Sequence, residues 1–161
     1  MLWQCLDALA LTERQIAQVE RTIGQVMRRD FFREVYGILT SFPGVALVTA
    51  ATVIAEIGDF KRFPDTKAIG RYAGLNPRVF ASGGKQRMGH IAKTGSSDLR
   101  WILQQAAWTA IRYDEHVKRI FLRIAKRAGR KAAAVAIARK LLTWMHSAVV
   151  KGEPYRTRTA A

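Results

Sequence analysis

LNPRVFASGGKQRMGHIAKTGSSDLR, residues 75–100, is the stretch in which extended segments interrupt an otherwise helical sequence. The extended segments are Arg-Val-Phe at 78–80 and Arg-Met-Gly-His-Ile at 87–91, joined by Ser-Gly-Gly-Lys at 82–85. Two such segments across a glycine-containing connection predict a β-hairpin. One hairpin is too small to form a sheet-based domain. We therefore predict a mostly α fold: a coiled-coil-like N-terminal helix, a helix-hairpin-helix, this small β-hairpin and a C-terminal helical bundle.

Positive charge surrounds Ser82 in this stretch. Ser82 precedes two glycines, and because glycine lacks a Cβ, a phosphodiester can approach the backbone closely there. Three interpretations stay open: a plain surface turn, a hairpin that binds backbone phosphate, or a serine that attacks phosphorus with His90 as its base. The candidate DNA contacts of the stretch are Arg78, Gly83, Gly84, Lys85, Arg87, His90, Lys93 and Arg100.

The distribution of charge indicates the class of partner. The chain has 161 residues and a formal net charge of +15. Residues 1–60 hold five basic and seven acidic residues, whereas residues 61–161 hold 22 and five. This excess predicts a polyanionic partner. Nucleic acid is favoured over a membrane, because no helix pairs a basic face with a face of exposed large aromatic residues; we predict DNA as the partner.

Other features of the composition limit which compartment and which cofactors are expected. A single cysteine, Cys5, excludes an internal disulfide and favours a reducing compartment. The three histidines lack the spacing of zinc ligands. The longest apolar run, residues 45–57, is too short to span a bilayer, and Met1 leads directly into a helical pattern without the basic segment of a signal peptide. We expect a cytoplasmic, nucleoid-associated protein with no membrane contact.

The N-terminal residues follow a heptad pattern. Such a pattern predicts a coiled-coil arm whose partner is another subunit, and hence a homo-oligomer. The alternative is a helix packed on its own domain. The two apolar positions of the heptad hold Leu2, Leu9, Ile16 and Ile23, and Cys5, Thr12, Val19 and Val26.

A helix-hairpin-helix is predicted within residues 38–57. A helix over about 30–40 is followed by Phe-Pro-Gly-Val-Ala at 42–46 and by a helix that is apolar nearly all round, which predicts its burial. The free amides of the turn and of the second helix's first residues attract phosphate. A plain αα-hairpin remains the alternative, since Ala46 stands where a second glycine is common. The candidate contacts are Pro43, Gly44, Val45 and Ala46.

The remaining segments are expected to build the bundle. Phe60 and Phe63 flank Lys61 and Arg62, which predicts two exposed cations, both candidate DNA contacts, between buried anchors. Tyr72 is expected in the core. Further helices are predicted over about 66–73, 99–111, 117–125 and 131–150.

Two surface features of these helices are also predicted. Trp101 and Trp108 lie off the apolar stripe of their helix and are expected to cover a neighbouring helix. The helix over 117–125 has an apolar face and a basic face without alternating acids, which favours contact with a polyanion over a merely solvated surface. Its cations are Lys118, Arg119, Arg123, Lys126 and Arg127.

An ordered set of short motifs resembles the C-terminal half of a bacterial insertion-sequence transposase. The similar family is the DEDD type of the IS110/IS116 group, with a RuvC-like N-terminal domain. The motifs are Pro-Gly-Val at 43–45, Ala-Glu-Ile-Gly-Asp at 55–59, Tyr-Ala-Gly-Leu-Asn-Pro at 72–77, Ser-Gly-Gly-Lys at 82–85, Gly-His-Ile at 89–91, Gln-Ala-Ala at 105–107, Ala-Arg-Lys-Leu-Leu at 138–142 and Gly-Glu-Pro-Tyr at 152–155.

The resemblance implies a division of the chain and a role for Ser82. Residues 1–37 would be the end of an interdomain coiled coil, 38–155 the C-terminal transposase domain and 156–161 a frayed tail. Ser82 would be the nucleophile of strand exchange, forming a covalent phosphoserine link to DNA. Four acids of the RuvC-like domain would bind Mg²⁺, and a guide RNA would be a further partner.

This chain departs from the family's pattern in its acidic residues. Residues 61–161 hold five acids, widely spread, and no set of four clustered acids. We therefore expect that the chain has the nucleophile without the metal, as a truncated or split fragment that binds DNA or guide RNA but does not recombine DNA unaided. The alternatives are a non-catalytic helix-hairpin-helix nucleic-acid-binding module and a basic RNA-binding or structural protein.

Overall fold

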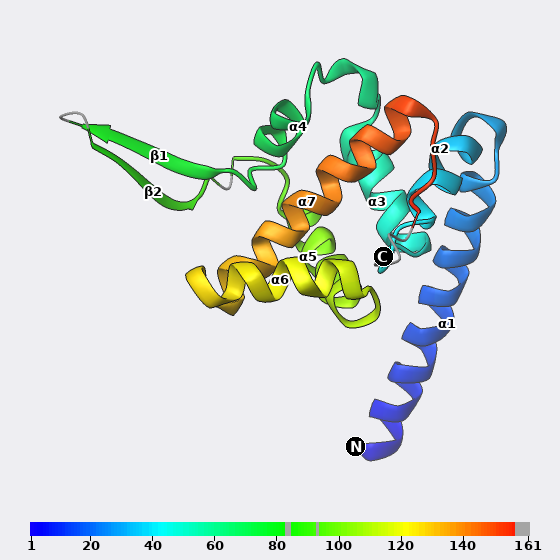
Figure 1. Cartoon of the computed structure of the whole chain (residues 1–161). Helices are drawn as coiled ribbons and strands as arrows, with labels where there is room; N and C mark the ends of the chain where they lie inside the picture. Colours follow the sequence, from blue (N-terminus) through cyan, green and yellow to red (C-terminus); the bar gives the residue numbers. More distant parts are fainter. Residues whose placement is uncertain (83–84, 93, 157–161) are drawn as a thin grey trace.

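The computed structural model describes residues 1–82, 85–92 and 94–156, and for residues 78–82, 85–88 and 90 it describes the backbone only. This part of the chain is mostly helical, as predicted, with one two-stranded sheet (Figure 1). In chain order the elements are α1 (Leu2–Met27), α2 (Asp30–Thr40), α3 (Leu47–Ile57), the short 3-10 helix η1 (Phe60–Arg62), α4 (Thr66–Tyr72), β1 (Pro77–Ser82), β2 (Lys85–Ile91), α5 (Ser97–Tyr113), α6 (Glu115–Ala128) and α7 (Arg130–Lys151).

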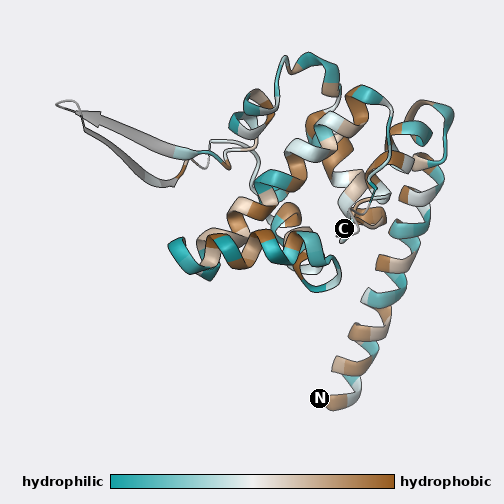
Figure 2. Ribbon diagram, in the orientation of Figure 1, coloured by the Kyte–Doolittle hydropathy of each residue, from teal (hydrophilic) through white to brown (hydrophobic). Residues whose placement is uncertain are grey.

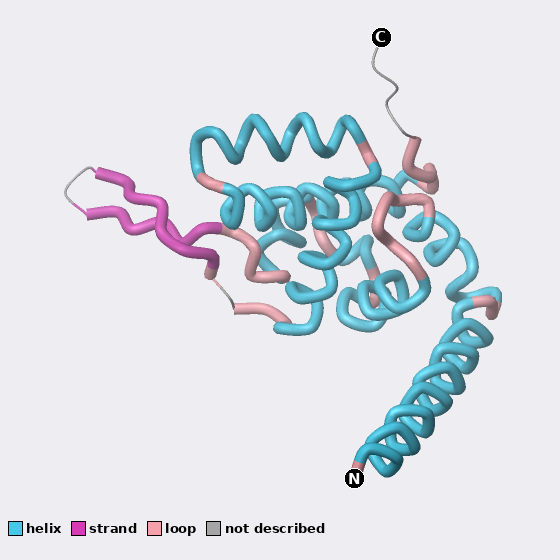
Figure 3. The backbone as a smooth tube through the Cα atoms, turned by 90° about the horizontal axis from the view of Figure 1, so that it is seen from below, coloured by secondary structure: helices cyan, strands magenta, loops and turns pink. Residues whose placement is uncertain are grey.

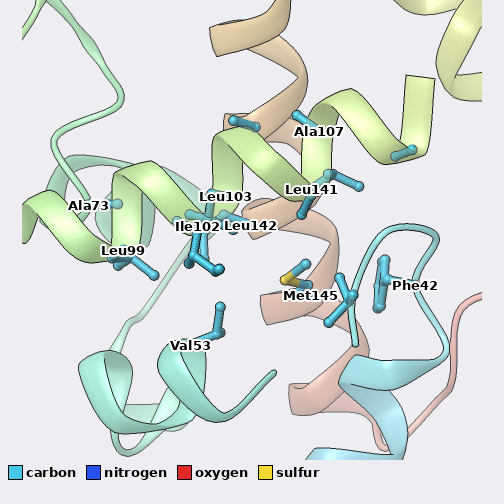
Figure 4. Packing of buried hydrophobic residues seen from close by; sticks show 14 of the residues in the cluster. Phe42, Val53, Ala73, Leu99, Ile102, Leu103, Ala107, Leu141, Leu142 and Met145 are labelled. Atoms are coloured by element: carbon cyan, nitrogen blue, oxygen red, sulfur yellow. The ribbon is translucent and has the colours of Figure 1, made fainter. Parts of the chain in front are cut away.

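Helix α7 lies at the centre of the core. It packs against α4, α5 and α6, and its side chains meet Leu99 and Leu103 of α5 and Val53 of α3 (Figure 4). By length and composition α7 is apolar enough to cross a membrane, yet 44% of its apolar window is buried inside this fold. The fully or almost fully buried residues of α7 are Ala133, Ala134, Ile137, Ala138, Leu141, Leu142 and Met145.

Polar side chains cap the N-termini of α5 and α6. Ser96 Oγ accepts a hydrogen bond from the Leu99 amide at 3.2 Å and begins α5. Asp114 Oδ1 accepts one from the Val117 amide at 2.9 Å and begins α6. Side-chain oxygens at these positions satisfy amides that the first turn leaves free. The apolar spacing of α5 is confirmed as well, because Leu99, Ile102, Leu103, Ala106, Ala107 and Ala110 are all buried.

Helix α1 extends away from the helical body (Figures 1 and 3). Residues 1–22 are exposed, and only the last turn, with Ile23, Val26 and Met27, packs against the core. The alternative of a helix packed on its own domain is therefore wrong for these first 22 residues. The apolar heptad positions stay open to solvent along them, with Leu9 56% and Ile16 53% exposed. Pairing with another subunit stays a prediction.

Three expectations about burial are corrected. Helix α3 is not buried all round, since Val48 is 40% exposed. Tyr72 is also 40% exposed, not in the core. Trp108 covers α6 through an edge contact with Phe121, with ring centroids 5.8 Å apart, whereas Trp101 remains 62% exposed. Aromatic rings with a polar or polarisable edge tolerate such half-exposed sites.

Candidate nucleic-acid interface

The predicted β-hairpin is confirmed in the backbone. β1 and β2 pair antiparallel, with Phe80 opposite Arg87 and Ser82 opposite Lys85, and the register shifts between Pro77 and Val79. The hairpin projects from the helical body on the side of α4 (Figures 1 and 3). Ser82 thus stands at the end of β1 that is far from the body. Gly83, Gly84 and Lys93 lie outside the described residues, and the side-chain positions of Arg78, Ser82, Lys85, Arg87 and His90 do too.

The base of the hairpin is fixed to the body by close backbone contacts. The Ala92 amide donates to the Asn76 carbonyl at 2.8 Å. Gly95 lies directly on the end of α4: a Cβ there would overlap the Tyr72 carbonyl oxygen and lie 2.8 Å from the Ala73 carbonyl carbon. Only glycine permits this approach. We call this region, made of Asn76, Ala92, Gly95 and the end of α4, the hairpin root.

Arg100 holds the same root from α5. It is half-buried, and its Nη1 donates to the Gly95 carbonyl oxygen at 2.5 Å. Charge-assisted bonds of this kind are stronger than neutral ones. The observed role of Arg100 is therefore to position the root, while its predicted contact with DNA stays a prediction.

Arg62 lies beside the root on an aromatic platform. Its Cζ is 4.7 Å from the ring centroids of both Phe63 and Tyr72, and the Tyr72 hydroxyl donates to the Glu56 carbonyl at 2.9 Å. Stacking on aromatic faces orients a guanidinium without removing it from solvent, and both Arg62 and Lys61 are exposed as predicted. This arrangement also explains why Tyr72 is not in the core.

The α2–α3 turn has a different environment. Gly44 has φ +80°, and a Cβ on it would overlap the Ala106 carbonyl oxygen and lie 2.9 Å from Thr109 Cβ, so the turn is pressed onto α5. Val45 is buried, and its amide donates to the Phe42 carbonyl at 3.1 Å. Packing alone thus requires the glycine. Pro43 is half-buried and Ala46 exposed, and phosphate binding by this turn stays a prediction.

The predicted contacts therefore form two groups, which lie at different places along α5. Arg62, Arg100 and the hairpin meet at the N-terminal end of α5, whereas the turn contacts Ala106 to Ala110. At a rise of about 1.5 Å per residue, Arg100 and Ala106 are ~9 Å apart along the helix axis. The structure brings the first group together and leaves the turn outside it.

The basic face of α6, for which the sequence favours contact with a polyanion, lies outside the set of candidate DNA contacts. Hydrophilic residues lie along α6 and at the start of α7 (Figure 2), and all the cations of this face are exposed. Among the described residues one ion pair forms on it, between Lys118 Nζ and Glu115 Oε1 at 2.8 Å. The available signal is the lack of any acid between Glu115 and Glu153. The remaining cations of this face are Arg119, Arg123, Lys126, Arg127, Arg130 and Lys131.

The acids of the chain do not form a metal site within the described residues. No three aspartate, glutamate, histidine or cysteine side chains there lie close enough to hold an ion. Asp65 and Asp114 cap helices, and Asp59 accepts from the Lys61 amide at 2.8 Å. These residues do not fit a magnesium ion, which the family resemblance places in the RuvC-like domain.

Comparison with known proteins places the chain in a family. The model of the "Transposase IS116/IS110/IS902 family" matches residues 36–122, more than half of the chain, including the α2–α3 turn, the hairpin and α5. A probable family 20 transposase of Pseudomonas aeruginosa is 32% identical over 112 residues, which is 70% of this chain and 32% of that protein.

Two further relatives agree with this assignment. The transposase for insertion sequence element IS1111A of Coxiella burnetii is 32% identical over 120 residues, covering 72% of this chain and 33% of its own length. The pilin gene-inverting protein of Moraxella bovis is 30% identical over 155 residues, 94% of this chain and 46% of that protein. The chain thus spans about a third to a half of the length of these relatives, and it belongs to the IS116/IS110/IS902 family of transposases.

Proposed function

We propose that this chain is the DNA-binding and nucleophilic-serine part of an insertion-sequence transposase. The observation that carries the proposal is the hairpin, which holds Ser82 opposite Lys85 at its outer end and is fixed at its root by Gly95 and Arg100. A serine at the outer end of a projecting hairpin is suited to reach a strand whose duplex lies against the body. The matched family segment contains the whole hairpin.

The proposed chemistry is a transesterification. Ser82 Oγ forms a bond to a DNA phosphorus, the bridging phosphorus–oxygen bond breaks, and that oxygen leaves as a hydroxyl after taking up the proton that the serine loses. Lys85 and Arg87 on β2 supply positive charge for the phosphate, which carries extra negative charge as the bond breaks. Magnesium binding is assigned to the family's RuvC-like domain, and we expect no recombination by this chain without it.

A non-catalytic nucleic-acid-binding module is the second candidate function. The basic face of α6 favours it, because six exposed cations without an ion pair among the described residues can bind backbone phosphate with no contribution from Ser82. In that case the hairpin would be a contact element only.

Trapping of a covalent adduct separates the two candidates. The chain is mixed with a full-length relative whose corresponding serine is replaced by alanine, and labelled DNA from the element's end is added. Denaturing gels should show a DNA adduct at this chain's mass with the wild type and with Ser97→Ala, an exposed serine on α5. Ser82→Ala should lose the adduct and keep duplex affinity. Equal adduct with Ser82→Ala contradicts the nucleophile, and duplex binding with no adduct in any mixture favours the binding module.

A further inference from the structure

A pocket of about 410 Å³ lies between the C-terminal half of α7, residues 153–156 and the N-terminal turn of α6. None of its lining residues belongs to α4, α5 or the hairpin, so it is distinct from the site proposed for Ser82. The volume falls within the range typical of sites for small organic groups. Four of its lining residues carry aromatic rings: Phe42, His116, Trp144 and Tyr155.

These rings form a series of similarly oriented planes. The ring centroids of His116 and Trp144 are 6.2 Å apart at an interplanar angle of 33°, and those of Trp144 and Tyr155 are 6.5 Å apart at 31°. Phe42 packs behind Tyr155, with centroids 4.8 Å apart at 37°. His116, Trp144 and Tyr155 are half-buried, whereas Phe42 is buried. Aromatic rings from α6, α7, the α2–α3 turn and the C-terminal segment thus line the pocket together.

The wall made by the C-terminal segment is held in place by specific bonds. The Tyr155 hydroxyl donates to Asp114 Oδ2 at 2.9 Å, and the Tyr155 amide donates to Ser41 Oγ at 2.7 Å. Asp114 is 4% exposed and also caps α6. A buried carboxylate that accepts two hydrogen bonds fixes its partners well. These hydrogen bonds therefore fix Tyr155 in the wall of the pocket.

Charge around the pocket selects the kind of ligand. Lys151 and Arg156 line it. Lys140 Nζ lies over the Trp144 ring, 5.6 Å from the ring centroid. Glu153 is the acid among the lining residues and is exposed. Aromatic faces beside cations suit a ligand that is flat on one part and anionic on another, and a carboxylate accepts from exocyclic amines. A nucleotide has all three properties.

We propose that this pocket binds an unpaired nucleotide of a DNA or RNA strand, with the base stacked against Trp144 and Tyr155 and the phosphate at Lys151 and Arg156. The proposal rests on the proposed function in one respect, that the partner is nucleic acid. Bases within a duplex are already stacked on each other and do not enter a side pocket, so the site discriminates unpaired strands from duplex. It gives this end of the molecule a task separate from the hairpin.

Binding of short labelled strands to the whole chain tests the proposal. The probes are an oligodeoxycytidylate, an oligocytidylate, an abasic deoxyribose-phosphate strand of equal length and a duplex of equal charge. Fluorescence anisotropy should show that the base-containing strands bind about tenfold more tightly than the abasic strand, the effect of stacking one or two bases. The two cytidylate strands carry the same base, so a preference between them identifies DNA or RNA as the source, and equal affinities mean that the pocket contacts the base and not the sugar.

Trp144 provides the matched variants. Trp144→Ala should remove the preference over the abasic strand, Trp144→Phe should retain part of it, and Trp101→Ala, which removes an exposed tryptophan outside the pocket, should leave it unchanged. Arg156→Ala, at an exposed position, should weaken all single strands about threefold to tenfold through the phosphate and so tests the pocket even if Trp144→Ala unfolds.

A second readout follows the pocket directly. With Trp3, Trp101 and Trp108 changed to Phe, Trp144 is the sole tryptophan, and base-containing strands should quench its emission while the abasic strand does not. Equal affinity for base-containing and abasic strands, or equal losses with Trp101→Ala and Trp144→Ala, overturns the proposal. Failure of the adduct at Ser82 leaves these results untouched, so the two proposals fail separately.

Discussion

Two parts of the molecule project from the helical body, the hairpin and α1, and they are joined to it in opposite ways (Figure 1). The hairpin root is held by backbone contacts so close that Gly95 has no room for a side chain, and Arg100 donates a hydrogen bond to the Gly95 carbonyl oxygen. Helix α1 is held only by its last turn, and its first 22 residues are exposed. The hairpin's direction is therefore set by contacts within this chain, whereas α1 leaves an apolar face exposed to solvent.

The strongest test of this contrast breaks the hairpin root. Gly95→Val should destabilise the chain by about 3 kcal/mol, because the new side chain overlaps the end of α4. The melting temperature should fall by about 10 °C by circular dichroism. Gly37→Ala is the matched control, since nothing lies within 4 Å of its Cβ and α2 gains a better helix former. A loss of similar size in both variants would show that the root is not specially packed.

The second test concerns the apolar face of α1. Leu9→Asp together with Ile16→Asp should weaken self-association at least about 100-fold, since charges would be buried in the predicted coiled coil. Sedimentation equilibrium measures the association. The melting temperature of the monomer should stay within about 1 °C of the wild type, because both residues are more than half exposed. A wild type that is monomeric at all accessible concentrations contradicts pairing through α1.

A third test asks whether the basic face of α6 is a specific surface for duplex DNA. Arg119→Ala with Arg123→Ala should weaken duplex DNA about tenfold and lower the slope of log affinity against log salt by about 2, because each arginine is expected to neutralise one phosphate. Arg14→Ala with Arg21→Ala on α1 removes the same charge elsewhere. If both pairs lower the slope equally, only net charge matters and the basic face of α6 is not a specific surface.

The smallest expected effect sharpens the description of the root. Arg62→Ala should cost about 0.5–1 kcal/mol, since it removes the stacking of the guanidinium on Phe63 and Tyr72. The melting temperature should fall by about 2 °C. Lys67→Ala, an exposed residue of α4, serves as the control and should change it by less. An unchanged value for Arg62→Ala would mean that the stacked arrangement adds nothing to stability.

Local patterns predicted much of the fold. The 3–4 spacing in α5 is a property of neighbouring residues, and the burial of its apolar stripe confirms it. The hairpin followed from two extended segments across glycines, and β1 and β2 have that arrangement. Helix α2 was expected over about 30–40 and begins and ends there.

Contacts between distant segments could not be predicted in the same way. In the sequence Gly95 resembles an ordinary loop residue before a helix, and only the fold shows that it lies on Tyr72 and Ala73. Tyr72 has the composition of a core residue, yet Arg62 stacks on its ring at the surface. The pocket of Trp144 and Tyr155 combines residues from the α2–α3 turn, α6, α7 and the C-terminal segment. Periodicity in the sequence does not predict contacts between such distant segments.

Asp114 has a consequence for communication within the molecule. Its Oδ1 holds the first turn of α6, whose outer face carries the cations, and its Oδ2 holds the Tyr155 hydroxyl at the wall of the aromatic pocket. One side chain therefore belongs to both surfaces. We expect filling of the pocket to reduce fraying at the start of α6, and by reciprocity a polyanion on α6 to tighten the pocket, so that the two occupancies are thermodynamically linked.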